Sequence, residues 1–324
     1  MIKVGLVGTG YAAKLRAEAL QQDDRAQLIA VTGHTLDKTV EFSQTHEAEA
    51  VEHWADLVAR SDLDLVIVAN VNRDHGAVVR AALDAGKHVV VEYPLSLDVA
   101  EAEDLRQRAS AQQKLLHVEH IELLSGIHGA AKSALAAIGT PFYVRYSSLN
   151  PQRPAPQKWT YHPELFGFPL MGAVSRIHRL TDLFGEVASV YCQARFWGAA
   201  DLTCPYTSCL CTAQLRFRSG LIADVLYGKG EAIWQSSRSL EIQGQQGAIL
   251  VDQEQGVLVQ AEQTIPLEVG TRRGLFARDT KMVLDYLIDG TPLYVSVASS
   301  LHALRVADAA QRSAETGQAI ELTP

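Results

Sequence analysis

Apolar and polar positions in the first third of the chain follow the pattern of buried strands that alternate with amphipathic helices. Short apolar runs rich in Val, Ile and Leu are typical of strands that are buried on both faces of a parallel sheet. The strands predicted in this way cover 2–7, 27–32, 63–69, 87–91 and 115–118. The segments between and after them predict helices at 14–20, 37–45, 54–60, 75–84 and 98–112. This alternation predicts a doubly wound parallel sheet, a Rossmann fold.

The pattern changes after residue 122. A helical stretch at 123–138 leads into strand-like segments at 142–148, 187–196, 208–217, 221–227, 239–243, 248–251 and 256–260, and helices at 277–288 and 297–316 close the chain. Ser219-Gly220 and Gln245–Gly247 predict hairpin turns. Strands in succession predict an α+β domain with a large, open, mainly antiparallel sheet. We therefore expect domains at 1–122 and 123–324, and leave open whether the C-terminal helix packs back on the first.

Composition and charge exclude several classes of protein. The 324 residues are 47% apolar and 20% charged, which is ordinary for a globular chain. The net charge of −8 and the lack of a Lys and Arg cluster argue against binding to nucleic acid or to an anionic membrane surface. No apolar run approaches the ~20 residues of a spanning helix. The first strand begins at residue 2, which leaves no room for a signal peptide, so we expect a cytoplasmic protein.

The four cysteines form no pattern that predicts a metal site. Cys192, Cys204, Cys209 and Cys211 contain no CxxC pair and have no His residues at ligand spacing. We expect them to be reduced thiols and expect no metal.

A glycine-rich turn connects the first strand to the first helix. In Gly8-Thr9-Gly10-Tyr11-Ala12-Ala13, Gly8 permits the tight turn and Gly10 lets the backbone approach a pyrophosphate. Ala13 is small enough for close packing of helix and strand, and the helix N-terminus attracts phosphate. The turn predicts a dinucleotide site formed by Gly8, Thr9, Gly10, Tyr11, Ala12 and Ala13, and the alternative is an ordinary tight turn.

The end of the second strand bears on the choice between NADPH and NADH. NAD-preferring folds carry an acidic residue there, and it bonds the ribose 2′-hydroxyl. This chain has Gly33, His34 and Thr35 instead, with Lys38 one turn later. The missing acid favours NADPH over NADH, although the segment could be an ordinary loop. Further residues expected to line the cofactor follow the later strands, namely Asn70, Val71, Asn72, His75, Glu92, Tyr93 and Glu119.

The chain resembles the Gfo/Idh/MocA oxidoreductases over its whole length. The resemblance rests on the GxGxxA turn, on Glu92-Tyr93-Pro94 after the strand at 87–91, and on the open sheet that follows. Sugar and polyol dehydrogenases of that family carry Glu-Lys-Pro, and a helical Asp-x-x-x-His whose side chains transfer the proton. Tyr93 replaces the Lys here, and Ser175 and Arg179 replace the Asp and the His. Because arginine cannot serve as a base, the resemblance does not imply oxidation of an alcohol.

The substituted residues resemble a narrower group, the biliverdin reductases, and among them the cyanobacterial type. The matching segments are Glu92–Leu95, His117–Leu124, Trp159–His162, Phe166–Pro169, Ser175–Ile177, Leu183–Gly185, Tyr227–Glu231 and Arg272–Phe276. This resemblance implies NADPH-dependent reduction of the central methine bridge of biliverdin to bilirubin, with a proton delivered to a pyrrole nitrogen. The alternatives are a sugar or cyclic polyol dehydrogenase, and a catalytically inactive regulator that binds cofactor or bilin.

The resemblance also suggests catalytic residues. It places Arg176 beside the pyrrole nitrogens, whereas helix spacing alone would equally allow a salt bridge with Asp182, two turns on. Glu119 and Glu122 could hold the nicotinamide, order water or supply the proton, or could simply complement a helix dipole. Tyr93 is expected to support cofactor or bilin.

The expected contacts with substrate are Tyr93, His120, Phe168, Arg176, Arg179 and Lys229. The aromatic run from Trp159 to Phe168 could form an apolar wall for the bilin or belong to the core. Lys229, Arg272 and Arg273 could hold its propionates. A monomer and a homodimer both fit the sequence.

Overall fold

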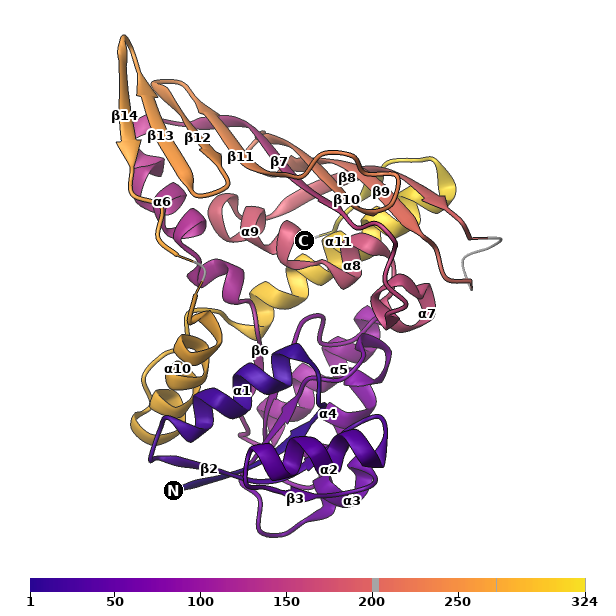
Figure 1. Cartoon of the computed structure of the whole chain (residues 1–324). Helices are drawn as coiled ribbons and strands as arrows, with labels where there is room; N and C mark the ends of the chain where they lie inside the picture. The colour runs from indigo at the N-terminus through magenta and orange to yellow at the C-terminus, as the bar shows by residue number, and fades with distance from the viewer. Residues whose placement is uncertain (200–203, 272, 324) are drawn as a thin grey trace. The chain divides into compact units, whose positions relative to one another are not determined.

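The computed structural model describes residues 1–199, 204–271 and 273–323, and it divides the chain into two compact units (Figure 1). Unit 1 comprises Met1–Ile121 and Gly274–Leu301, and unit 2 comprises Glu122–Arg273 and His302–Pro324. The division after residue 121 lies next to the expected boundary. The segment Gly274–Leu301 differs from expectation, because it groups with unit 1.

Unit 1 is built on a six-stranded sheet in its described residues, in the order β3-β2-β1-β4-β5-β6, and every neighbouring pair is parallel. The strands are β1 (Ile2–Val7), β2 (Ala26–Thr32), β3 (Glu49–Ala50), β4 (Leu65–Val68), β5 (His88–Val91) and β6 (Leu116–Val118). The order reverses between β1 and β4, the place where such sheets bind dinucleotides at the carboxyl ends of their strands. The expected Rossmann fold is confirmed.

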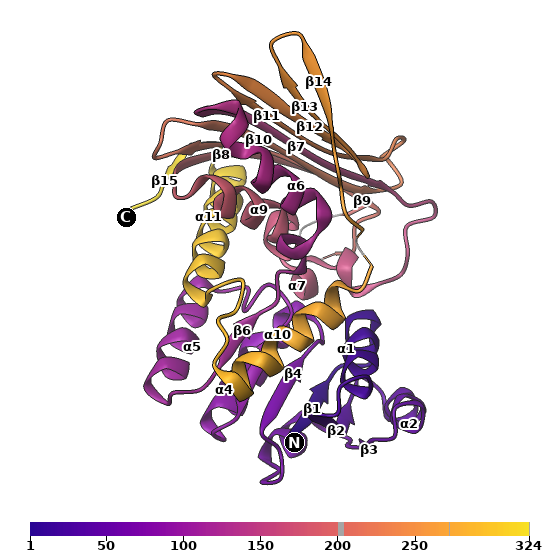
Figure 2. The same ribbon diagram turned by 90° about the vertical axis from the view of Figure 1, so that its left-hand side faces the viewer.

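The helices of unit 1 follow the predicted positions closely. They are α1 (Tyr11–Gln21), α2 (Leu36–Thr45), α3 (Trp54–Ala59), the 3-10 turn η1 (Asn72–Asp74), α4 (His75–Asp84), α5 (Val99–Ala111) and, from the later segment, α10 (Leu275–Asp289). Figures 1 and 2 both show α10 lying along α1. Val283 and Leu284 of α10 share one core cluster with Ala13, Ala17 and Leu20 of α1. Burying each such valine or leucine contributes about 1.5–3 kcal/mol, so the apolar stripe of α10 places this segment in unit 1.

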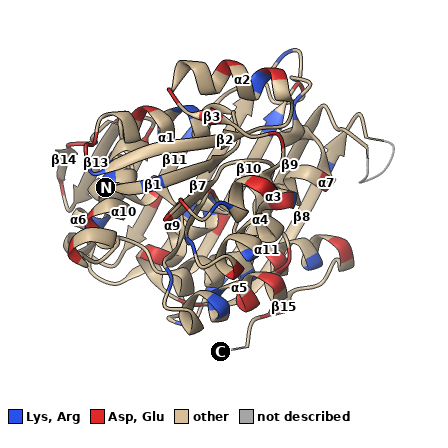
Figure 3. Ribbon diagram, turned by 90° about the horizontal axis from the view of Figure 1, so that it is seen from below, with Lys and Arg blue, Asp and Glu red and all other residues tan. Residues whose placement is uncertain are grey.

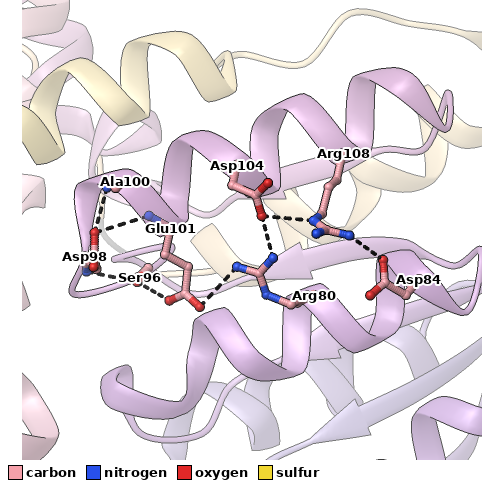
Figure 4. A network of polar contacts seen from close by, with 8 residues as sticks. All are labelled: Arg80, Asp84, Ser96, Asp98, Ala100, Glu101, Asp104 and Arg108. Atoms are coloured by element: carbon pink, nitrogen blue, oxygen red, sulfur yellow. Dashed lines mark hydrogen bonds and ion pairs between the residues drawn. The ribbon is translucent and has the colours of Figure 1, made fainter.

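Charged side chains join α4 to α5 (Figure 4). Arg80 of α4 reaches both Glu101, at 3.5 Å, and Asp104 of α5. Asp98 caps α5, because its carboxylate accepts from the N–H groups of Ala100 and Glu101 at 2.7 and 3.2 Å. Figure 3 shows acidic and basic positions interspersed along the helices, as in the pairs of this interface.

Unit 2 carries a nine-stranded sheet in its described part, in the order β14-β13-β12-β11-β7-β10-β9-β8-β15. The strands are β7 (Pro141–Pro151), β8 (Val187–Trp197), β9 (Ser208–Phe217), β10 (Ile222–Gly230), β11 (Ser237–Gly244), β12 (Gly247–Asp252), β13 (Gln255–Gln260), β14 (Gln263–Leu267) and β15 (Ile320–Glu321). The pair β7 and β10 is parallel, and its neighbours are antiparallel. Both predicted hairpins, β9–β10 and β11–β12, are confirmed. Short β3, β14 and β15 were not predicted.

The helices of unit 2 lie on one face of its sheet in both views, and the other face carries none of the described helices (Figures 1 and 2). They are η2 (Ile121–Leu124), α6 (Gly126–Ala134), η3 (Leu135–Ile138), η4 (Trp159–Tyr161), α7 (Pro163–Phe166), α8 (Pro169–Gly172), α9 (Ser175–Phe184) and α11 (Val297–Thr316). The helix predicted at 123–138 is divided, because Ser125 has an extended backbone before α6. Every helix among the described residues is too short or too polar to span a lipid bilayer.

Candidate active site

The turn between β1 and α1 has the geometry that a pyrophosphate requires. Gly8 has a φ of +130°, and a Cβ there would lie 2.3 Å from the carbonyl oxygen of Ala69, so only glycine fits. A Cβ on Gly10 would meet no atom within 4 Å, which leaves open space at the helix start. The first turn of α1 has no acidic residue and Gly10 gives no side-chain cap, so its N–H groups can bind an anion. Fully buried Ala13 packs against the sheet.

The end of β2 carries the polar and basic side chains that were predicted to select NADPH. His34, Thr35 and Lys38 are all exposed there. A Cβ on Gly33 would lie 2.7 Å from the Thr9 side chain, so the position is already filled. This crowding is consistent with the absence of an acidic residue at Gly33.

His75 connects the ends of β4 and β5. Its Nδ1 donates to the carbonyl oxygen of Pro94 at 2.7 Å, and its Nε2 lies 3.3 Å from the carbonyl oxygen of Asn70. The residue is 1% exposed, and burial lowers its pKa. His75, predicted to line the cofactor, holds together the loops that follow β4 and β5. Asn72 is also buried, and Val71 is half-buried.

A buried ionic network lies beneath the carboxyl ends of β5 and β6. The Arg16 guanidinium donates to Glu92 Oε1 at 3.1 Å and to the carboxylate of Asp279. Asp279 also pairs with His117 and accepts from the Tyr294 hydroxyl, each at 2.8 Å. Burial alone would raise the pKa of Asp279, but the charge of Arg16 and the contact with His117 outweigh it and hold that pKa below its usual range.

Sequence reasoning missed Arg16 and Asp279. The two residues stand 263 positions apart, so no local spacing relates them. One sequence feature could have identified Arg16, because it falls in the apolar stripe of α1 between Ala13 and Leu20. A charge at such a position requires a buried partner.

Glu119 pairs with Glu92, not with Glu122. The two residues directly follow Val91 and Val118, which are paired in the register of β5 and β6, so the two carboxyl groups leave neighbouring strands side by side. Glu119 is 1% exposed and also accepts from the N–H of Ile121. Burial and the negative charge of Glu92 raise the pKa of Glu119 well above its usual range, although Arg16 opposes them.

Tyr93 rests on the ring of His120. The ring centroids are 5.5 Å apart and the planes differ by 9°. His120 is fully buried, its Nε2 lies 2.7 Å from Ser300 Oγ, and its backbone N–H donates to the Tyr294 hydroxyl at 3.0 Å. His120, predicted as a substrate contact, is buried in this structure and supports the half-buried ring of Tyr93.

Arg176, near the start of α9, is half-buried. Its Nη1 donates to Ser175 Oγ at 2.6 Å, and its guanidinium carbon lies 5.8 Å from the ring centroid of Tyr227 on β10. Asp182, the alternative partner that helix spacing allowed, pairs with His128 at 2.8 Å and Lys132 at 2.9 Å. The Arg176 guanidinium is thus oriented by a hydroxyl and an aromatic face.

Glu122 and Arg179 form a buried ion pair within unit 2. Glu122 accepts from Arg179 at 2.8 Å and from Arg238 at 2.6 Å. Glu122 is 5% exposed and Arg179 is 1% exposed. Glu122 was predicted as a catalytic residue and Arg179 as a substrate contact. In the structure Glu122 balances two arginines of its own unit, and Arg179 is enclosed by its surroundings.

Lys229 lies in an aromatic cage rather than at an exposed position. Its Nζ is 4.0 Å from the ring centroid of Phe166, 4.7 Å from that of Tyr161 and 5.5 Å from that of Tyr206, and it donates to the carbonyl oxygen of Thr160. The residue is 6% exposed. Burial lowers the pKa of Lys229 to about 8, and the charge of Arg176 adds to that effect. The role of Lys229 as a propionate contact stays a prediction, for a side chain that is buried in this structure.

The remaining predicted contacts differ in exposure. Tyr161 and Phe166 are buried around the ammonium group, as the core interpretation of the aromatic run requires, whereas Phe168 is half-buried. Arg273 is exposed. Arg272 lies outside the described residues.

Comparison with known proteins identifies the family. Residues 2–120 match the NAD-binding Rossmann fold of an oxidoreductase family, Gfo/Idh/MocA, and residues 132–322 match the C-terminal alpha/beta domain of the same family. The chain belongs to the Gfo/Idh/MocA oxidoreductases. This membership and the geometry of the Gly8–Ala13 turn make it an NAD(P)-dependent oxidoreductase.

Among solved structures of Gfo/Idh/MocA proteins, this chain is similar to biliverdin reductase from Synechocystis sp. PCC 6803, in complex with biliverdin and NADP+. The two are 47% identical with a TM-score of 0.94, and the match covers 97% of this chain and 99% of the other. Mouse biliverdin reductase A is 28% identical over 58% of this chain, and human biliverdin reductase A is 33% identical over 42%. These alignments span 59% and 43% of the two mammalian proteins.

Proposed function

We propose that this protein is an NADPH-dependent biliverdin reductase, which reduces the central methine bridge of biliverdin to give bilirubin. The observation that carries the proposal is the 47% identity to the Synechocystis enzyme over 97% of the chain. The site supports it as well. Ser175 and Arg179 stand where sugar dehydrogenases of the family keep a proton-transferring pair, and Arg179 is locked to Glu122. Reduction of a methine bridge requires no base to deprotonate a hydroxyl.

The residues of unit 1 fit a bound NADPH. The N–H groups at the start of α1 would hold the pyrophosphate, with Gly8 and Gly10 giving it room. His34, Thr35 and Lys38 would bond the 2′-phosphate. Asn70–Asn72 and the pair Glu92 and Tyr93 would line the nicotinamide half. The bound cofactor supplies a hydride.

Arg176 would stabilise the electron-rich adduct that forms when hydride reaches the bilin. An arginine keeps its proton at any working pH, so its contribution is electrostatic. The bond to Ser175 Oγ and the face of Tyr227 orient the guanidinium before the substrate arrives. Preorganised donors of this kind contribute about 10²–10³ in turnover.

Other side chains would supply the proton and bind the substrate. Glu119 is the acid that could deliver the proton to a pyrrole nitrogen, while Tyr93 supports the cofactor. Phe168 would give an apolar contact to the tetrapyrrole, and exposed Arg273 would attract a propionate. Lys229 would attract the substrate through its positive charge while its side chain stays within the aromatic cage.

The proposal is tested by mixing the protein with NADPH and biliverdin and recording the visible spectrum. We expect the green pigment to turn yellow as NADPH is consumed, and slower turnover with NADH. Arg176→Ala should lower turnover at least about 100-fold with NADPH binding retained. Arg216→Ala removes an exposed arginine of β9, and this control should keep the rate of the unchanged protein.

Two other results would contradict the proposal. Bilin binding without turnover would indicate a regulatory or pigment-binding protein. If the protein neither binds nor reduces the bilin, the search would turn to sugars and cyclic polyols, the substrates of other family members. Unchanged turnover in Arg176→Ala would remove Arg176 from the mechanism.

A further inference from the structure

We propose that Glu92 and Glu119 hold one proton between them, and that this proton is released when the cofactor bound beside them carries the positive charge of its oxidised ring. The inference rests on the NADPH-binding part of the proposed function, and it does not depend on which compound accepts the hydride. It assigns Glu119 as the acid and Arg16 as a positioning residue.

The two carboxyl groups lie where the nicotinamide half of a dinucleotide is expected. In a sheet of this order each half of the ligand lies over one set of strands, on either side of the reversal between β1 and β4. Residues at the end of β2 contact the ribose that carries the adenine. The nicotinamide half is therefore expected beside the ends of β4, β5 and β6. Glu92 and Glu119 directly follow β5 and β6.

Adjacency and burial favour one shared proton for the pair. Two neighbouring carboxyl groups can form a hydrogen bond with each other only if one of them is protonated. Glu119 is 1% exposed, so water cannot solvate a second negative charge there. The raised pKa of Glu119, caused by burial and by the charge of Glu92, agrees with this arrangement.

The surrounding groups determine which carboxyl carries the proton. Arg16 of α1 forms ion pairs with Glu92 and with Asp279 of α10. His117 of β6 and the Tyr294 hydroxyl are directed to Asp279 and not to Glu119. Glu92 therefore carries the negative charge, compensated by Arg16, and Glu119 carries the proton.

The positive charge of the oxidised cofactor would favour the ionised form of Glu119 over the protonated form. A positive charge within about 4–6 Å of a carboxyl favours its ionised form and lowers its pKa by about 1–3. Hydride transfer creates that charge on the nicotinamide ring. The O–H bond of Glu119 then breaks, its electron pair remains on the carboxylate, and the proton leaves for the substrate or for water. No other group is oxidised or reduced in this step.

The test measures protons released on cofactor binding, without any bilin. We would titrate the full-length protein with NADP+ and with NADPH by calorimetry, in two buffers that differ in ionisation enthalpy. We expect up to about one proton released with NADP+ and none with NADPH. Because NADP+ prefers the ionised pair, the ratio of Kd for NADP+ to Kd for NADPH should fall up to about tenfold per unit rise in pH.

Glu119→Gln decides whether this proton belongs to the pair. Glutamine is neutral and can still donate a hydrogen bond to Glu92, so the variant should bind NADPH but release no proton, and the ratio should become independent of pH. Glu103→Gln, on α5 in unit 1, is the matched control and should behave as the unchanged protein. Melting temperatures of both variants check that they fold.

Glu92→Gln gives an independent readout. Removing the charge of Glu92 removes one cause of the raised pKa of Glu119, while the opposing charge of Arg16 remains. Glu119 should therefore ionise more easily, and proton release should shift to lower pH. Binding of both cofactors without any proton release would overturn the inference, and so would undiminished release in Glu119→Gln. Failure to bind either cofactor would instead contradict the proposed function.

Discussion

At the scale of single residues, burial determines the chemistry of the ionisable groups in both units. Burial lowers the pKa of His178 to about 4, so the imidazole next to Arg179 is neutral. Burial also lowers the pKa of Lys229 to about 8, close to the pH at which enzymes work. Desolvation disfavours the charged form in each case.

Lys229 should make the stability of the protein depend on pH. Its pKa is 10.5 in an unfolded chain and about 8 in the fold, so between these values the unfolded chain binds more protons. The free energy of unfolding should therefore rise with pH across this interval, by up to about 3 kcal/mol relative to Lys229→Met. Urea unfolding of both proteins from pH 7 to pH 10.5 measures the difference.

The control is Lys158→Met, which removes an exposed lysine two residues from Thr160. Its difference from the unchanged protein should stay constant with pH. If the difference for Lys229→Met is equally constant, the ammonium group does not titrate in this interval and the cage does not lower its pKa.

At the scale of elements, the turn from β1 into α1 gives its two glycines different tasks. Gly8 is required by the backbone, because its φ of +130° and the nearby Ala69 carbonyl exclude a side chain. Gly10 has an ordinary extended backbone and open space beside it. The first glycine therefore serves folding, and we expect the second to serve the ligand.

Alanine substitutions should separate these two tasks. Gly10→Ala should leave the melting temperature within about 2 °C of the unchanged protein, because its Cβ meets nothing, yet weaken NADPH binding at least about tenfold. Gly8→Ala should lower the melting temperature, because strain and the contact with Ala69 cost about 1–3 kcal/mol. Differential scanning fluorimetry and cofactor titration give both quantities. Equal effects of the two changes on stability would contradict the assignment.

At the scale of the whole molecule, the cofactor site and Arg176 belong to different compact units. The Gly8–Ala13 turn, Glu92 and Glu119 lie in unit 1, and Arg176, Tyr227 and Lys229 lie in unit 2. A ligand that binds only the folded form of unit 1 should stabilise that unit by mass action.

NADPH at about 100 times its Kd should raise the free energy of opening of unit 1 by about 2.7 kcal/mol. Hydrogen exchange followed by mass spectrometry should show this as slower exchange in β1, β4 and β5. The exchange rates of strands β9 and β10 of unit 2 should change less. Gly10→Ala is the control, since a tenfold weaker affinity should reduce the gain to about 1.4 kcal/mol at the same NADPH concentration. Equal slowing in all five strands would show that the two units open together.

The sequence by itself determined the elements and the phosphate turn. Strand and helix periodicity depends on a few neighbouring residues, so most predicted elements, the parallel and antiparallel sheets and both hairpins agree with the structure. The GxGxxA turn is equally local. The motifs of both domains also sufficed to indicate the family, which the comparisons confirm.

The tertiary structure alone decided which charges meet. Glu119 pairs with Glu92 because β5 and β6 are neighbours in the sheet, and Arg16 meets Asp279 because the apolar stripe of α10 packs on α1. Lys229 is buried because the segment that carries Thr160 and Phe166 closes over it. The physical reason is common to all three: burial and pairing depend on contacts between residues far apart in sequence, and local patterns do not encode them.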